Sequence, residues 1–74
     1  MDKEYNSTYW LLDTMTLNER HVWLQVIESP IGNIYAVQYE KQHMEIETKL
    51  FYLDLDKADA YYKRVCKKIV DGKI

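Results

Sequence analysis

The chain has little of what usually identifies a small protein: one cysteine, one proline, two glycines and no long apolar run in 74 residues. Cys66 has no partner for an internal disulfide, whereas secreted domains of this size usually carry several. The charged start of the chain is not that of a signal peptide. No segment approaches the ~20 apolar residues of a membrane span. We therefore expect a cytoplasmic protein in a reducing compartment, with no membrane association.

Recognisable chemical motifs are absent as well. His21, His43 and Cys66 are far apart and lack the spacing of zinc ligands. No glycine-rich loop is present that could hold a phosphate. Cys66 lies among apolar helical positions, where a thiol usually acts as a small inert hydrophobe. The sequence predicts a protein that is not an enzyme and has no metal or cofactor.

The composition is that of a folded chain, with 47% hydrophobic and 30% charged residues. Seventy-four residues suffice for one small core. We expect a single domain over 1–74, in which 1–7 form a loosely held N-terminal segment.

Apolar and polar residues alternate as in β-strands up to about Leu53. The predicted strands are Tyr9–Thr16, Val22–Ile27, Ile34–Glu40 and Met44–Leu53. An alternative is a helix that begins at Thr16, where Thr16 and Glu19 fit a capping box, and runs through Ile27. The β-branched residues of Val22–Ile27 favour the strand.

Helical spacing replaces the alternation after Leu53 and predicts a helix over Lys57–Val70. Asp56 is the expected N-cap, and Gly72 is the expected stop. The apolar stripe of this helix comprises Ala58, Tyr62, Val65, Cys66 and Ile69. The predicted fold is therefore α+β: a four-stranded, mainly antiparallel sheet followed by one C-terminal helix packed on one face (ββββα).

One helix covers only one face of a sheet, so the second face is a candidate interaction surface. The helix is expected to cover Val22, Leu24, Val26, Tyr35, Val37, Tyr39, Ile46 and Leu50. The predicted partner-binding residues on the second face are Trp10, Trp23, Ile27, Ile34 and Phe51, with Trp10 depending on the strand register. The N-terminal segment could instead fold over this face, or a β-bulge could change which side chains point there.

The charge is divided along the chain. Residues 1–56 carry four basic and ten acidic side chains, a net charge of −6, whereas residues 57–74 carry six basic and two acidic ones, a net charge of +4. The candidate anion-binding or nucleic-acid-binding residues are Lys63, Arg64, Lys67 and Lys68. Such a run can equally be a solvated helix face whose charge suits the helix dipole.

These patterns favour a protein-binding module that works through its apolar and aromatic sheet face. We expect self-association, as a homodimer, or a protein partner, because aromatic side chains dominate such interfaces. Inhibitors encoded by phages and other mobile elements have this kind of composition, although no residue points to one. The alternative is nucleic-acid binding by the basic helix face, which the acidic sheet half opposes.

Overall fold

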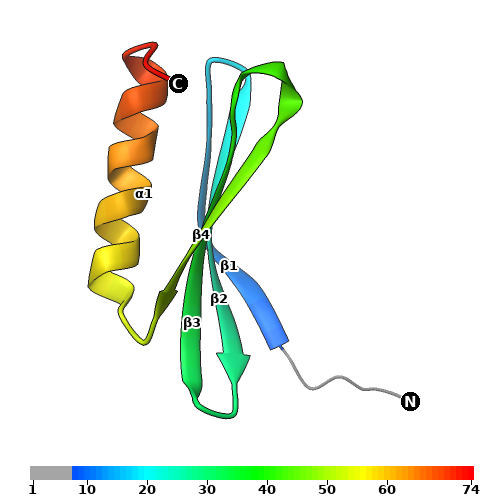
Figure 1. Cartoon of the computed structure of the whole chain (residues 1–74), viewed down its shortest axis with the longest axis vertical. Helices are drawn as coiled ribbons and strands as arrows, with labels where there is room; N and C mark the ends of the chain where they lie inside the picture. Colours follow the sequence, from blue (N-terminus) through cyan, green and yellow to red (C-terminus); the bar gives the residue numbers. More distant parts are fainter. Residues whose placement is uncertain (1–7) are drawn as a thin grey trace.

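In the computed structural model, which describes residues 8–74, four strands precede one long helix. The elements in chain order are β1 (Thr8–Leu17), β2 (Arg20–Ser29), β3 (Gly32–Glu40), the 3₁₀-helix η1 (Gln42–Met44), β4 (Ile46–Tyr52) and α1 (Leu55–Val70). Figure 1 shows α1 along one side of the sheet, so the predicted ββββα fold is confirmed. The expectation of a loosely held segment 1–7 lies outside the described residues.

The sheet is an antiparallel meander with the strand order β1-β2-β3-β4. Asn18 and Glu19 join β1 to β2 with φ values of 50° and 65°, the left-handed conformation that a tight hairpin turn requires. Pro30 and Ile31 join β2 to β3. Because β2 extends from Arg20 to Ser29, the strand prediction for this segment is confirmed and the helical alternative is wrong.

A β-bulge interrupts β1. Leu11 lies opposite Gln25 and Asp13 lies opposite Leu24, so Leu12 has no partner in the register. The extra residue reverses the alternation of side chains in the rest of β1. Asp13 therefore lies on the side of the sheet that faces the helix.

The helix begins earlier than the sequence predicts, and Asp54 rather than Asp56 is its N-cap. The carboxylate of Asp54 accepts a hydrogen bond from the backbone N–H of Lys57 at 3.0 Å. The predicted stop is confirmed, because Gly72 takes a φ of 74° and the N–H of Lys73 donates to the carbonyl of Lys68 at 2.8 Å.

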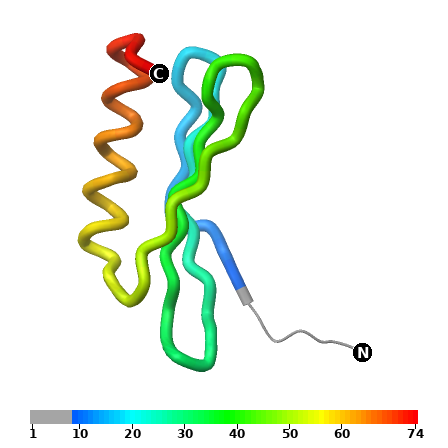
Figure 2. Tube along the Cα trace, viewed as in Figure 1, coloured from blue at the N-terminus to red at the C-terminus, as the bar shows by residue number. Residues whose placement is uncertain are grey.

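The core lies between α1 and the middle strands, and all five residues of the predicted helix stripe are buried in it. The core cluster comprises Val22, Leu24, Val37, Tyr39, Ala58, Tyr62, Val65, Cys66 and Ile69. Burial raises the pKa of the Cys66 thiol. Figure 2 shows that the β2–β3 hairpin extends beyond the first turn of α1, whereas the last turn lies beside the opposite end of the sheet.

The prediction for the faces of β4 is wrong. Ile46 lies opposite Glu40 and Leu50 lies opposite Ala36, which puts both on the side away from α1. Phe51 lies instead on the helix side, where its ring centre is 5.5 Å from that of Tyr61. Alternation identifies which residues of a strand share a face, but here both faces carry apolar side chains and the pattern does not say which face the helix covers.

Candidate functional site

The side of the sheet away from α1 has no element over it among residues 8–74, and we call it the open face. Strand register and alternation place on it Tyr9, Leu11, Thr14 and Thr16 of β1, His21, Trp23, Gln25 and Ile27 of β2, Ile34, Ala36, Gln38 and Glu40 of β3, and Ile46, Thr48, Leu50 and Tyr52 of β4. Among these positions only His21 and Glu40 can carry a charge near neutral pH. An open sheet face of a monomer normally carries polar and charged side chains, so this one is unusual in how few of its side chains are charged.

The half of the open face near the β2–β3 turn is apolar. Ile27 and Ile34 lie opposite each other at its centre, flanked by Tyr9 and Tyr52 on the two edge strands. Tyr9 and Tyr52 are 68% and 60% exposed. This row gives the face a half-buried aliphatic centre with exposed aromatic side chains on both sides.

Polar side chains in the middle of the open face bond to one another. The side-chain amide of Gln25 donates to the side-chain oxygen Oε1 of Gln38 at 3.1 Å. The side-chain amide of Gln38 in turn donates to the hydroxyl of Thr48 at 3.1 Å. Because these groups already have partners within the sheet, covering them costs less free energy than burying free amides would.

The other end of the open face holds His21 and Glu40, its two side chains that can carry a charge near neutral pH. The ring of His21 stacks on Trp23 with ring centres 5.7 Å apart, and His21 Nδ1 lies 3.1 Å from Glu40 Oε1. Glu40 also accepts the backbone N–H of His21 at 2.8 Å. This backbone bond, followed by the His21 side chain, lowers the pKa of the Glu40 carboxyl.

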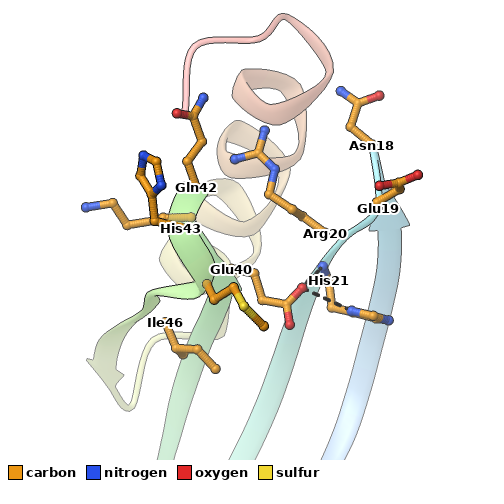
Figure 3. A pocket seen from close by; sticks show the side chains of 10 residues that line it. Asn18, Glu19, Arg20, His21, Glu40, Gln42, His43 and Ile46 are labelled. Carbon is orange, nitrogen blue, oxygen red and sulfur yellow. Dashed lines mark hydrogen bonds and ion pairs between the residues drawn. The ribbon is translucent and has the colours of Figure 1, made fainter.

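A hollow of about 520 Å³ lies beside this end, between the β1–β2 turn and the β3–β4 connection (Figure 3). It is lined by Asn18, Glu19, Arg20, His21, Glu40, Lys41, Gln42, His43, Met44 and Ile46. Both of its rims are turns with two successive left-handed residues: Asn18 and Glu19 on one side, and His43 and Met44, each with a φ of 65°, on the other.

The hollow brings both histidines to one place, but it offers no obvious reaction. No serine, threonine or cysteine lines it, and Cys66 lies in the core instead. Nη1 of Arg20 has no hydrogen-bond partner among residues 8–74, yet this atom is shielded from solvent and from a ligand in the hollow. The positive charges of the lining are offset by its carboxylates, including that of Glu40.

The structure brings together only some of the predicted partner-binding residues. Trp23, Ile27 and Ile34 share the open face. Trp10 lies opposite Val26 and therefore belongs to the helix side, as does Phe51. Their predicted place on the second face is wrong: Phe51 because β4 presents its other side to α1, and Trp10 because its register pairs it with a core residue.

Sequence reasoning missed the contributions of the edge strands, namely Tyr9, Leu11, Leu50 and Tyr52. The run of apolar residues over 50–53 hides the alternation of β4, since either parity looks apolar. No signal in the sequence marks the bulge at Leu12. The pairing of Tyr52 with Ile34 would have followed from a correct β3–β4 register alone.

The predicted basic face of α1 is partly neutralised. Lys63 Nζ lies 2.9 Å from Asp59, and Lys67 Nζ lies 3.2 Å from Asp71. The hydrogen bond and charge of Asp59 raise the pKa of Lys63. Within the described part of the chain, Arg64 and Lys68 have no such carboxylate partner.

Residues 8–74 form a small α+β domain in which α1 covers one sheet face and no described element covers the other, almost uncharged face. No protein-family model matches the chain, and no curated protein or solved structure shows significant similarity to it. No three His, Cys, Asp or Glu side chains within residues 8–74 gather closely enough to hold a metal ion. The helix of this same region is too short and too polar to cross a membrane.

Proposed function

We propose that this protein is a non-enzymatic protein-binding module that self-associates through its open face. A second copy lies face to face with the first, as two packed sheets do, so that Ile27 and Ile34 of both copies lie within the contact. Trp23 and the edge tyrosines add aromatic contacts to it. Aromatic anchors of this kind each contribute ~2 kcal/mol or more in protein interfaces.

The nearly uncharged character of the face is the observation that carries the proposal. A face without lysine, arginine or unpaired carboxylates offers no charge for a charged partner to match, whereas two copies meet without repulsion. The paired amides of Gln25 and Gln38 lower the desolvation cost further.

The area of the face sets the expected affinity. Four strands about 4.8 Å apart, with about 3.3 Å per residue over seven residues, cover roughly 440 Å². Two such faces bury roughly 900 Å² when they are treated as flat, and protruding side chains add to this area. Specific interfaces bury about 1,200 Å² at the lower end of their range. We therefore expect a weak, concentration-dependent dimer.

The same face would serve an inhibitor encoded by a phage or other mobile element, with the inhibited protein in place of the second copy. The single cysteine supports a reducing, cytoplasmic location for either role. The two roles differ in the measured mass of the purified protein, because only self-association raises it.

Sedimentation velocity over a concentration series tests the proposal. The native protein is expected to shift from monomer to dimer, and Leu50→Lys is expected to remain monomeric, because Leu50 is an exposed member of the open face. Ile31→Lys is the matched control, since Ile31 is 73% exposed at the β2–β3 turn and outside the face. A native protein that stays monomeric throughout, or a Leu50→Lys variant that dimerises normally, would contradict self-association.

Nucleic-acid binding by α1 is the alternative function. It is supported by the absence of carboxylate partners for Arg64 and Lys68 among residues 8–74, and it is weakened by the ion pairs of Lys63 and Lys67. Binding of labelled DNA or RNA that disappears steeply with added salt would favour it.

A further inference from the structure

A second, smaller hollow lies where β4 meets α1. It has a volume of about 290 Å³ and is lined by Lys49, Phe51, Lys57, Ala60, Tyr61 and Arg64. We call it the Tyr61 hollow. Three of its six lining side chains are cations and two are aromatic, and none is a carboxylate.

Helix and strand spacing bring these side chains together. Lys57, Tyr61 and Arg64 are four and three residues apart, so they share one side of α1. Lys49 and Phe51 are two residues apart on the helix side of β4. Lys49 Nζ lies 5.4 Å from the centre of the Tyr61 ring, and the Phe51 ring packs beside that ring.

The cations of the Tyr61 hollow differ from those on the neighbouring helix surface. Among residues 8–74, Lys49 and Arg64 have no carboxylate within ion-pair distance, and Lys57 has only Asp54 at 4.0 Å. Lys63 and Lys67, by contrast, each hold a carboxylate close by. The hollow therefore concentrates positive charge that the carboxylates of residues 8–74 do not balance at close range, and an anion is the ligand that would balance it.

We propose that the Tyr61 hollow binds a nucleoside phosphate, with the phosphate on Lys49, Lys57 and Arg64 and the base against the rings of Tyr61 and Phe51. Cations that follow a phosphate backbone beside aromatic rings that stack on bases are the two elements of single-strand recognition. The small side chain of Ala60 leaves room for the ring of the base beside Tyr61. A volume of about 290 Å³ suits one nucleotide, either free or within a single strand.

This site is independent of the open face and of self-association. It moves the nucleic-acid alternative from the exposed side of α1 to the junction of α1 with β4. β4 is an edge strand of the sheet that residues 8–74 form.

Fluorescence anisotropy with a short labelled oligothymidylate tests the site. One phosphate neutralised by the three cations predicts a slope of about −0.7 in log affinity against log salt on a single strand. The double variant Lys49→Glu/Arg64→Glu is expected to lose at least about tenfold in affinity at low salt, because two of the three contacts become repulsive.

The matched control is Lys63→Glu/Lys67→Glu, which changes the net charge by the same amount on the paired helix surface. It is expected to bind within about threefold of the native protein, because its cations are already neutralised. Equal losses in the two double variants would reduce the effect to overall charge and overturn the site. Absence of binding by the native protein at low salt would overturn it as well. Both double variants should sediment as the native protein does, which keeps this test separate from the test of self-association.

Removal of the Tyr61 ring tests whether the base stacks on it. Tyr61→Leu is expected to weaken oligothymidylate binding by at least about fivefold, whereas Tyr61→Phe keeps it. Competition with adenosine triphosphate and with tripolyphosphate distinguishes a free nucleotide from a nucleotide within a single strand. If adenosine triphosphate displaces the oligothymidylate at a lower concentration than tripolyphosphate does, the ligand is a free nucleotide. If neither compound displaces it, the ligand is a strand. Equal displacement by both, with no effect of Tyr61→Leu confirmed as folded by circular dichroism, would overturn the role of the base.

Discussion

The side-chain amide of Asn18 donates to the backbone carbonyl of Ile69 at 2.8 Å and so ties the β1–β2 turn to the last turn of α1. The two residues are 51 positions apart, and the bond is partly buried. The same carbonyl also accepts the backbone N–H of Gly72 at 3.1 Å, so the Asn18 amide adds a second bond at the C-terminal end of the helix. The same residue has a φ of 50°, a conformation that asparagine tolerates better than most residues.

Two substitutions separate these roles of Asn18. Asn18→Gly keeps the left-handed conformation and loses only the bond, so its free energy of unfolding should fall by about 0.5–1.5 kcal/mol. Asn18→Ala loses the bond as well and keeps a β-carbon in the left-handed region without the polar group that lets asparagine tolerate it, so it should cost about 1–2 kcal/mol more than Asn18→Gly. Urea denaturation measures both. Equal losses for the two variants would contradict the conformational part of the argument.

Gly32 combines an unusual conformation with a close neighbour. Its φ is 123°, and an added Cβ would overlap the side chain of Leu53. We expect Gly32→Ala to destabilise the fold by about 1–3 kcal/mol. Gly72→Ala should cost less, because Gly72 has open space around it. The double variant Gly32→Ala/Leu53→Ala should recover part of the loss by removing the overlap, and thermal unfolding of the four proteins would show whether it does.

The helix was the most predictable part of the fold. Its buried stripe and its Gly72 stop follow from the sequence, since helical spacing sorts residues onto one side without reference to the sheet. Its start was misplaced by two residues, because Asp54 and Asp56 are both good caps and only the path of the chain after β4 selects Asp54.

The candidate face was only partly predictable, for a reason that lies in the sheet. Trp23 and Ile27 were placed correctly, because β2 is a middle strand whose other side is an unbroken row of core residues. The sequence says less about which residues of the edge strands point to which face. Leu12 forms a bulge in β1 that no sequence signal marks, and β4 carries apolar side chains on both of its faces. The Tyr61 hollow was missed because Lys49 and Arg64 come from different elements and meet only in the folded chain.

The buried tyrosines are expected to make the protein less stable at alkaline pH. Burial, with the neighbouring Tyr61 hydroxyl, raises the pKa of Tyr39 from 10.0 to about 12, and burial also raises the pKa of Tyr62. Between these two pH values the unfolded chain loses protons that the folded chain keeps, so stability is full below pH 10 and falls as the pH rises towards 12.

Urea midpoints measured across this pH range check the expectation. Tyr39→Phe and Tyr62→Phe should each flatten the decline. Tyr52→Phe, whose ring is 60% exposed on the open face, should leave it unchanged and is the control. At neutral pH Tyr62→Phe should not lower stability, because the Tyr62 hydroxyl is buried without a hydrogen-bond partner among residues 8–74. A steep decline that persists in both core variants would assign it to other groups.

The adjacent residues Leu50 and Phe51 test the assignment of the two sheet faces directly. Phe51 packs on Tyr61 at the edge of the core, so Phe51→Lys should lower the free energy of unfolding by at least about 2 kcal/mol. Leu50→Lys places its charge on the open face and should cost less than about 1 kcal/mol in the monomer. Both are measured at low protein concentration, because dimerisation would add its own stability to the native chain and not to Leu50→Lys. The opposite order of stabilities would mean that α1 covers the other side of β4, and it would remove the structural basis of the open face at this edge.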